Sequence, residues 1–275
     1  MRIAVTGSQG QLGQALYDRN QGYEMLRIDL PEHDITDIAA IVPLLQAFSP
    51  DVILHAAAMT DVDGCERDPD AAFHINVTGT RNMVAAALEV NCPLVYISTD
   101  YVFDGSQELP YCEYDQVNPL SVYARTKWLG EQIVRQHASR HYIVRIAWLY
   151  GAGPRNFVRT VLRLAKERGQ MTMVTDELGS PTNANDVADA LYQLIRMPAY
   201  GTFHLPNAGV CSRFEWASTI LDYSEISGVV VHPSTNYQRL AQVPKQVALR
   251  NFMGAEVGIV MRPWQEALRE YLGSS

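Results

Sequence analysis

A short apolar run followed by a glycine-rich turn constrains this chain more than any other stretch. Ile3-Ala4-Val5 is typical of a buried strand, and Gly7, Gly10 and Gly13 follow it, ahead of a helical pattern. The first glycine lets the chain turn sharply, the second lets the backbone approach a phosphate, and the third lets the helix pack against the strand. The spacing is Gly-x-x-Gly-x-x-Gly, so a glycine-rich surface turn is the alternative interpretation.

An acidic residue at the end of the next strand favours the phosphate-binding interpretation. Met25–Ile28 reads as that strand, and Asp29 follows it about 20 residues after the glycines, where a carboxylate meets an adenosine ribose. The sequence therefore predicts a nicotinamide dinucleotide, NADPH or NADH. Asp29 would repel a 2′-phosphate, whereas Arg19 and Arg27 could neutralise one, so we expect both cofactors to be used, with NADH at least competitive.

Composition favours a small-molecule partner. The chain has 275 residues and a net charge of −8, and its Lys and Arg residues are scattered along the sequence, so we expect neither a nucleic-acid partner nor a membrane partner. No membrane-length apolar run is present, and a strand that starts at Arg2 leaves no room for a signal peptide, so a cytoplasmic protein is expected. The cysteines form no Cys-x-x-Cys pair, which predicts free thiols and no metal site.

Alternating strands and helices predict the fold class. Strands are expected at Val52–Leu54, Leu94–Ser98 and Tyr142–Ala147, and helices at Ile38–Phe48, kinked or shortened by Pro43, and at Asp70–Glu89. This order predicts an α/β protein with a Rossmann-type, doubly wound parallel sheet. Its ligand would lie beyond the carboxyl ends of the strands.

The later part of the chain predicts a smaller C-terminal substrate-binding lobe. A helix at 156–168 and a strand at Met171–Val174 are followed by a helix at 185–196, and from Gly201 the alternation loosens, with a short strand at Thr202–Leu205. Helices are then expected at 214–221 and 263–272. We expect a dinucleotide-binding domain at 1–200 and a substrate-binding lobe at 201–275; an alternative boundary places 151–170 in the lobe.

Tyr123 and Lys127 form the second chemical motif. They are four residues apart in a predicted helix and share one of its faces. An ammonium near a phenol favours the phenolate and brings its pKa toward the range of an acid/base catalyst. The alternative is a packed Tyr beside a solvated Lys, but the glycine turn and Thr99, at the end of the intervening strand, support a site.

Several segments together resemble the extended short-chain dehydrogenase/reductase superfamily, and within it the dTDP-4-dehydrorhamnose reductases. They run in order through the whole chain: Thr6–Gly13, Ala57–Asp63 with Glu66, Ser98–Phe103, Tyr123–Lys127, Ala147–Gly151, Gly179–Thr182 and Trp264–Leu268. The resemblance implies an NAD(P)H-dependent oxidoreductase that reduces the 4-keto group of a nucleotide-linked 6-deoxyhexose, with dTDP-4-dehydrorhamnose as the expected substrate and dTDP-rhamnose as the product. A monomer or a homodimer is expected.

The resemblance also implies roles for individual residues. Tyr123 would donate the proton, Lys127 would bind the nicotinamide ribose and lower the pKa of Tyr123, and Thr99 would hydrogen-bond the reacting oxygen. The substrate-binding residues would be Thr99, Asp100, Tyr101 and Trp148. Besides Tyr123 and Lys127, the cofactor-binding residues would be Gly7, Gly10, Gln11, Leu12, Gly13, Asp29, Asp34, Ile35, Ala56, Ala57, Ala58 and Thr60.

Four points stay open. Tight packing would also explain Ala56–Ala58, and the alternative for Trp148 is that it is only a core residue at the end of its strand. Members of the family usually carry Arg and Ser where this chain has Val243 and Val247, so the substrate contacts there are open. The competing functions are another sugar-nucleotide enzyme, an epimerase or dehydratase, and a non-catalytic subunit resembling the methionine adenosyltransferase β subunit.

Overall fold

A six-stranded parallel sheet forms the centre of the computed structural model, which describes residues 1–153 and 155–273. The strand order is β10-β5-β4-β3-β1-β2, and every neighbouring pair is parallel. The strands are β1 (Arg2–Thr6), β2 (Glu24–Ile28), β3 (Val52–His55), β4 (Leu94–Thr99), β5 (His141–Ile146) and β10 (Gly201–His204). The predicted fold class, a doubly wound α/β sheet, is confirmed.

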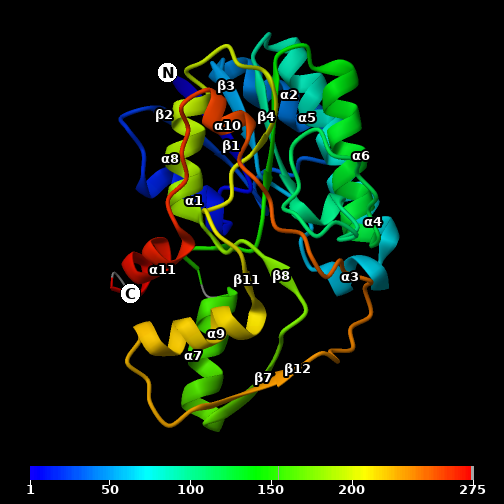
Figure 1. Cartoon of the computed structure of the whole chain (residues 1–275). Coiled ribbons are helices and arrows are strands. Elements are labelled where there is room, and N and C mark those ends of the chain that lie inside the picture. The colour runs from blue at the N-terminus through cyan, green and yellow to red at the C-terminus, as the bar shows by residue number, and fades with distance from the viewer. Residues whose placement is uncertain (154, 274–275) are drawn as a thin grey trace.

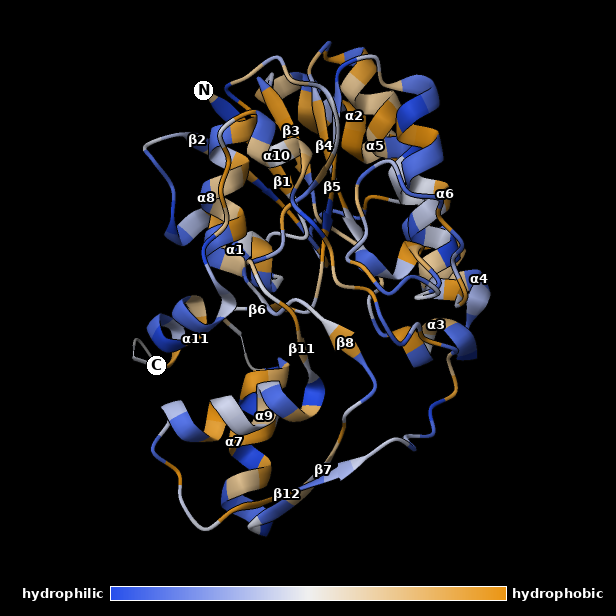
Figure 2. Ribbon diagram, viewed as in Figure 1, coloured by the Kyte–Doolittle hydropathy of each residue, from blue (hydrophilic) through white to orange (hydrophobic). Residues whose placement is uncertain are grey.

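Helices cover both faces of this sheet (Figure 1). Helices α1 (Gln11–Asp18) and α8 (Ala184–Leu194) pack on the face that holds Ile3 and Val5. Residues of α2 (Ile38–Phe48), α5 (Gly79–Glu89) and α6 (Val122–His137) pack on the opposite face. The central strands β3 and β4 are therefore buried along their whole length and are mainly apolar, coloured orange in Figure 2.

Two helix predictions need correction. Pro43 does not shorten α2, because its ring lies on the solvent side, where the carbonyl that loses its partner faces water. The helix expected at Asp70–Glu89 consists of three segments, α4 (Pro69–Phe73), a π-helical turn η1 (His74–Thr78) and α5. A π turn inserts one extra residue, and such turns are frequent at functional sites.

A small lobe lies below the sheet in Figure 1. Helices α7 (Phe157–Arg168) and α9 (Arg213–Tyr223) pack around Trp216, with the parallel strands β7 (Gln170–Val174) and β12 (Val230–Ser234) beside them. Short elements connect the lobe to the sheet: β6 (Leu149–Tyr150), β8 (Leu178–Gly179), β9 (Thr182–Asn183), β11 (Cys211–Ser212), α10 (Met253–Glu256) and α11 (Trp264–Gly273). Two more, α3 (Val62–Arg67) and the 3-10 turn η2 (Asp100–Val102), follow strands β3 and β4.

The chain alternates between the sheet and the lobe. The strand predicted at Thr202–Leu205 was assigned to the lobe, which is wrong: β10 pairs with β5 in the central sheet. Conversely, α7 and β7 contribute to the core of the lobe. After β12 the chain returns to the sheet as an extended segment, residues 235–249, which we call the strap; Figure 1 shows it passing beside α3.

The cysteine prediction is confirmed, because Cys65, Cys92, Cys112 and Cys211 are all free thiols. Among the helices that the structure describes, none combines the length and the apolar character needed to cross a bilayer.

Candidate active site

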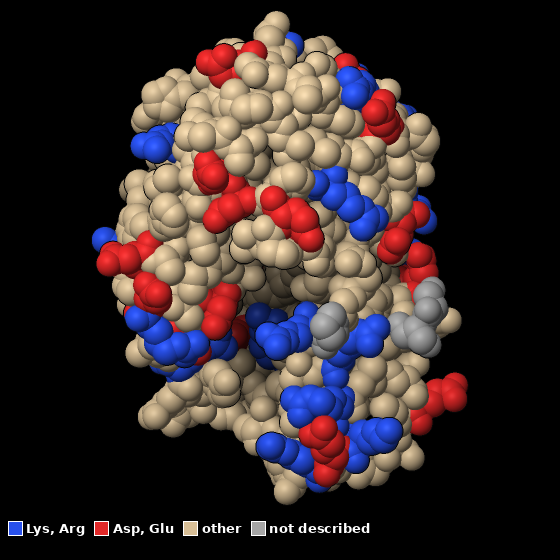
Figure 3. Space-filling model, turned by 180° about the vertical axis from the view of Figure 1, so that it is seen from behind, with Lys and Arg blue, Asp and Glu red and all other residues tan. Residues whose placement is uncertain are grey.

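A cavity of about 860 Å³ lies at the carboxyl ends of the strands, between the sheet and the small lobe. Figure 3 shows it from behind as a hollow, with Lys and Arg side chains along its lower rim and on the small lobe beneath it. In helix α7, Arg159, Arg163 and Lys166 are spaced by four and three residues and therefore share one face of the helix. The expectation of cationic residues scattered along the sequence did not include this local group.

The glycine turn forms one end of the cavity. Gly7 has a φ of +67°, and a Cβ there would lie 2.7 Å from the Ala57 nitrogen. A Cβ at Gly13 would lie 2.3 Å from the Gly7 oxygen. Helix α1 begins after Gly10 with no side-chain cap and no acidic residue in its first turn. Its first amides are therefore available to an anion.

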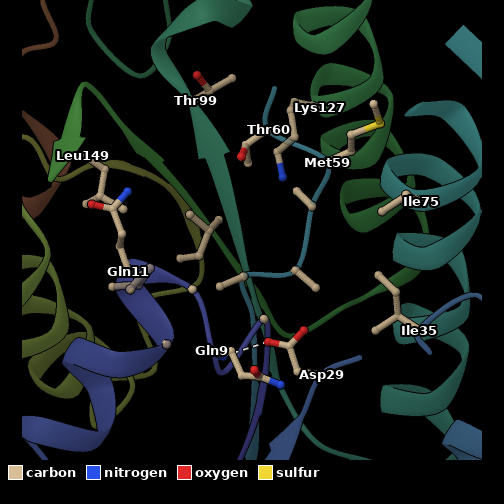
Figure 4. Close-up of a pocket in the computed structure, with 18 of the residues that line it drawn as sticks. Gln9, Gln11, Asp29, Ile35, Met59, Thr60, Ile75, Thr99, Lys127 and Leu149 are labelled. Atoms are coloured by element: carbon tan, nitrogen blue, oxygen red, sulfur yellow. Dashed lines mark hydrogen bonds between the residues drawn. The ribbon is translucent and has the colours of Figure 1, made fainter. Parts of the chain in front are cut away.

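Asp29 lies at the same end, where β2 stops. Its Oδ2 accepts a hydrogen bond from the Gln9 nitrogen at 2.7 Å, drawn as a dashed line in Figure 4, and its Oδ1 accepts one from the Leu30 nitrogen at 2.9 Å. The carboxylate thus fixes the glycine turn and still lines the cavity. Carboxylate oxygens can accept further bonds, so Asp29 stays available to ribose hydroxyls.

Tyr123 and Lys127 form the other end, on the first turns of α6. Ser121 caps this helix by accepting a hydrogen bond from the Ala124 nitrogen at 3.2 Å. Lys127 is 4% exposed, and its Nζ lies 4.2 Å from the centre of the Tyr96 ring. In Figure 4, Lys127 and Thr99 lie at the end of the cavity opposite Asp29.

The lowering of the pKa of Tyr123 by Lys127 stays a prediction for the chain with its ligands bound. Burial raises the pKa of Tyr123, although a hydrogen bond with Thr99 opposes the rise. Burial also lowers the pKa of Lys127 to about 7, opposed by the Glu131 carboxylate. At both groups, burial outweighs the effect that opposes it. Tyr123 is accordingly a phenol that holds its proton at neutral pH, the state that a proton donor requires.

Thr99 and Asp100 lie beside the phenol at the end of β4. The Thr99 hydroxyl donates to Asp100 Oδ1 at 2.9 Å and accepts from the Tyr101 nitrogen at 3.2 Å. Burial raises the pKa of Asp100, which is 3% exposed, to about 7, against the effects of Thr99 and Arg213. Asp100 Oδ2 is buried without a hydrogen-bond partner among the described residues, and Asp100 lines the cavity.

A buried ion pair fixes α6 relative to the sheet. Glu131, one turn after Lys127, is fully buried and accepts two hydrogen bonds from Arg145 of β5, at 2.9 and 2.8 Å, and one from Ser98 of β4 at 2.6 Å. Burial alone would raise the pKa of Glu131, but the Arg145 guanidinium outweighs it and the pKa is lowered. The catalytic helix and the Thr99 strand are thus held by one carboxylate.

Asn76, in the π turn, connects the cofactor side of the cavity to the catalytic helix. Its side chain accepts from the Met59 nitrogen at 2.8 Å and donates to the Thr126 hydroxyl at 2.9 Å. The loop of Ala56–Thr60 is therefore tied to α6, and Figure 4 shows Met59 and Ile75 along the same wall. Both Asn76 and Ile75 were missed, because a π turn has no sequence signature.

Trp148 has a left-handed backbone, with a φ of +42°, and lines the cavity. Its ring stacks on Trp216 at 5.6 Å and carries the Arg213 guanidinium 3.5 Å from its centre. A bulky residue in this conformation is strained and occurs mainly at functional sites. Trp148 thus packs in the core of the lobe and also lines the cavity. The sequence had offered these as alternatives, a core residue or a residue of the site.

The structure brings almost all of the predicted site residues to this one cavity. Those that line it are Gly7, Gly10, Gln11, Leu12, Gly13, Asp29, Asp34, Ile35, Ala56, Ala57, Ala58, Thr60, Thr99, Asp100, Tyr123, Lys127 and Trp148. Tyr101 lies beside the cavity, with its ring edge-on to Tyr123 at 6.2 Å. Met59, inside the Ala56–Thr60 loop, and Ser98, beside Thr99, line it as well, as their positions predict. The lining also contains residues that were not predicted, namely Gln9, Ile28, Leu30, His33, Thr36, His74, Ile75, Ile97, Ile146 and Leu149. Of these, Ile97 and Ile146 could have been found from their position at the ends of strands.

The residues present fit a nicotinamide dinucleotide. Gly7 and Gly13 leave no space for a Cβ, the start of α1 carries no side-chain cap, and the Asp29 carboxylate and the Tyr123 phenol lie at opposite ends of the cavity. No group of three or more His, Cys, Asp and Glu side chains that could hold a metal occurs in residues 1–153 and 155–273.

Comparisons with known proteins agree with this geometry. The family of the RmlD substrate binding domain matches residues 1–275. A spore coat polysaccharide biosynthesis protein, SpsK of Bacillus subtilis, is 35% identical, over 98% of this chain and 96% of its own length.

Two solved structures resemble the whole chain. A dTDP-4-dehydrorhamnose reductase from Clostridium acetobutylicum has a TM-score of 0.96 and 39% identity, and covers 100% of this chain and 99% of its own. The Bacillus anthracis dTDP-4-dehydrorhamnose reductase in complex with NADP has a TM-score of 0.96 and 37% identity, with the same coverage.

Proposed function

The chain belongs to the RmlD substrate binding domain family, within the extended short-chain dehydrogenases/reductases, and from this premise we propose that it reduces the 4-keto group of a dTDP-linked 6-deoxyhexose with NADPH or NADH. The proposed substrate is dTDP-4-dehydrorhamnose and the product is dTDP-rhamnose. This reaction is a sugar-nucleotide reduction of the kind that supplies polysaccharide biosynthesis, the process in the name of the SpsK relative.

One observation carries the proposal: a proton-holding phenol and a glycine phosphate turn lie at opposite ends of one cavity. A dinucleotide bound with its pyrophosphate at Gly7–Gly13 has the length to reach Tyr123. When bound, the nicotinamide supplies a hydride. The Tyr123 phenol, which can supply the proton, then lies at the nicotinamide end of the cavity, together with the Thr99 hydroxyl and the Asp100 carboxyl.

The chain's own residues have separable roles in this proposal. Tyr123 donates its proton to the oxygen that becomes a hydroxyl. The Thr99 hydroxyl, which donates to Asp100 Oδ1 in the chain alone, turns its one hydrogen to the same oxygen. Lys127 binds the nicotinamide ribose. Once Tyr123 has given up its proton, the positive charge of Lys127 stabilises the Tyr123 phenolate. Asp100 hydrogen-bonds a sugar hydroxyl through Oδ2, the atom without a partner among the described residues, and Trp148 covers an apolar side of the hexose.

The test is a cofactor-oxidation assay with a panel of nucleotide-linked 4-keto sugars. We expect oxidation with dTDP-4-dehydrorhamnose and slower oxidation with the UDP-linked analogue. Turnover only of a sugar on another nucleotide would contradict the dTDP assignment and keep the reductase. Tight dinucleotide binding with no turnover of any sugar nucleotide would instead favour the regulatory subunit.

A further inference from the structure

Three charged side chains of the small lobe, Glu177, Arg213 and Arg239, form a cluster beside the catalytic end of the cavity. Arg239 Nη2 lies 2.9 Å from Glu177 Oε1, and Arg213 Nε lies 3.7 Å from Glu177 Oε2. The side chains are 12% exposed at Glu177, 17% at Arg213 and 23% at Arg239. The cluster is therefore largely removed from water, and it carries one positive charge in excess.

Three separate segments bring these residues together. Strands β8 and β11 pair antiparallel with Leu178 opposite Ser212, so Glu177 and Arg213 are the next residues facing each other. Arg213 is also the first residue of α9, whose start is fixed by a capping box of Ser212 and Glu215. Arg239 comes from the strap, which is fixed to α3 by a hydrogen bond of 2.9 Å from the Ala241 nitrogen to Asp63 Oδ1.

The cluster faces the candidate active site. The Arg213 guanidinium lies 3.5 Å from the centre of the Trp148 ring, and Trp148 lines the cavity together with Thr99 and Tyr123. Arg213 and Asp100 are also close enough that the arginine charge counteracts the burial of the Asp100 carboxyl. An anionic group attached to a sugar on Trp148 would thus meet Arg213 directly.

Arg213 has unused hydrogen-bonding capacity. Among the residues that the structure describes, it donates no hydrogen bond; its contacts are the faces of Trp148, Phe157 and Trp216 and the ion pair with Glu177 at 3.7 Å. A guanidinium carries five N–H donors in a planar fork that matches phosphate oxygens. The unpaired donors of Arg213 are therefore available to an anionic ligand.

We propose, resting on the proposed function, that Arg213 and Arg239 bind the diphosphate of the nucleotide sugar, and that Glu177 is the counter-ion that the diphosphate replaces. Glu177 neutralises the two arginines while the site is free. The diphosphate has more negative charge and more acceptor oxygens than one carboxylate. It therefore displaces the Glu177 carboxylate from Arg213 and Arg239. Because Arg239 belongs to the strap, the bound diphosphate also holds the strap against the lobe.

The test measures binding without turnover, by calorimetry on the full-length protein with NADP bound. The ligands are dTDP, UDP, inorganic pyrophosphate and thymidine. The variants are Arg213→Gln, Arg239→Gln and Glu177→Gln, and the control is Arg163→Gln, which removes an exposed arginine of the same lobe that also pairs with a glutamate, Glu167. Thermal unfolding and NADPH binding show whether each variant is folded.

We expect Arg213→Gln and Arg239→Gln each to weaken dTDP binding about 10- to 100-fold, the range for a lost hydrogen bond to a charged group. Thymidine and NADPH binding should stay at the level of the Arg163→Gln control, which separates this subsite from the cofactor's own pyrophosphate site. Glu177→Gln should tighten dTDP binding, because it removes the competing carboxylate.

Unchanged dTDP affinity in both arginine variants would contradict the proposed diphosphate subsite. If Arg213→Gln does not fold, the dTDP affinity of Arg239→Gln, on the strap, is the deciding result. Weaker dTDP binding in Glu177→Gln would overturn the counter-ion exchange. If neither pyrophosphate nor any nucleoside diphosphate bound the wild type, the subsite would also fall. Arginine-dependent dTDP binding by a protein that reduces no 4-keto sugar would contradict the proposed function and leave the subsite standing.

Discussion

Tyr123, Thr99 and Asp100 define the chemistry at the scale of single residues. All three side chains are buried. Burial raises the pKa of Tyr123, so the phenol keeps its proton, and it raises the pKa of the Asp100 carboxyl to about 7. At neutral pH, before any ligand binds, Tyr123 is therefore protonated and Asp100 is partly protonated. This state suits a reaction in which the chain must give a proton to an oxygen.

Tyr123→Phe should abolish most turnover while leaving the dinucleotide in place. The ring and its packing stay, and only the proton source is lost, which is worth roughly a hundredfold to ten-thousandfold in rate. The measurements are kcat with a 4-keto sugar nucleotide and the Kd of NADPH by fluorescence. Full turnover by the variant would show that another group is the acid.

Asp29 predicts the cofactor preference. Its carboxylate lines the cavity and would repel a 2′-phosphate, so we expect both cofactors to be used, with NADH at least competitive. The ratio of kcat/KM values for NADH and NADPH measures this. A strict requirement for NADPH would mean that Asp29 serves only to fix the glycine turn.

Asp100 predicts how stability depends on pH. Its pKa is about 7 in the folded chain and lower in the unfolded chain, so between about pH 4 and pH 7 the folded chain binds more protons, and this contribution to stability is lost as the pH rises. Asp100→Asn removes it. The free energy of unfolding of the variant minus that of the wild type should therefore increase with pH, by at most about 1.4 kcal/mol per pH unit.

Urea titrations from pH 4.5 to 7.5 measure this difference. Other groups titrate in both proteins and cancel. A difference that does not change with pH would show that Asp100 is ionised in the folded chain.

Glu131 matters at the scale of elements, because it holds α6 against β4 and β5. Glu131→Ala leaves Arg145 buried without its charge partner, and should destabilise the protein by about 3–5 kcal/mol. Glu167→Ala, which breaks the exposed i,i+4 pair with Arg163, is the control and should cost about 0–1 kcal/mol. Equal midpoints of urea unfolding for the two variants would refute the anchoring role of Glu131.

Elements with local causes could be predicted from the sequence, and elements with distant causes could not. The glycine turn and the Tyr123–Lys127 helix face follow from nearby residues, and both were placed correctly in the fold. Strand β10 was assigned to the lobe because only its pairing with β5 puts it in the sheet. Strand β12 was missed because it contains Pro233 and is largely exposed, so it lacks an apolar pattern.

At the scale of the whole molecule, the active site lies between two units that the chain enters several times. The sheet and its helices carry the glycine turn and Tyr123. The lobe contributes the core that packs against Trp148 and the cluster of Glu177, Arg213 and Arg239. This cluster could not be predicted from the sequence, because its members are brought together by the β8–β11 pairing and by the strap. Sequence patterns thus located the site residues of the sheet better than the charged cluster of the lobe.

Transfer of hydride to the sugar carbon is the central claim, and isotope labelling tests it most directly. The protein would be incubated with dTDP-4-dehydrorhamnose and NADPH that carries deuterium at the transferable position of the nicotinamide, and the product analysed by mass spectrometry and NMR. We predict one deuterium in the product, at C4 of the hexose, and none with Tyr123→Phe over the same time. A product without deuterium, or with deuterium at another carbon, would contradict the assignment of this site as a 4-keto reductase.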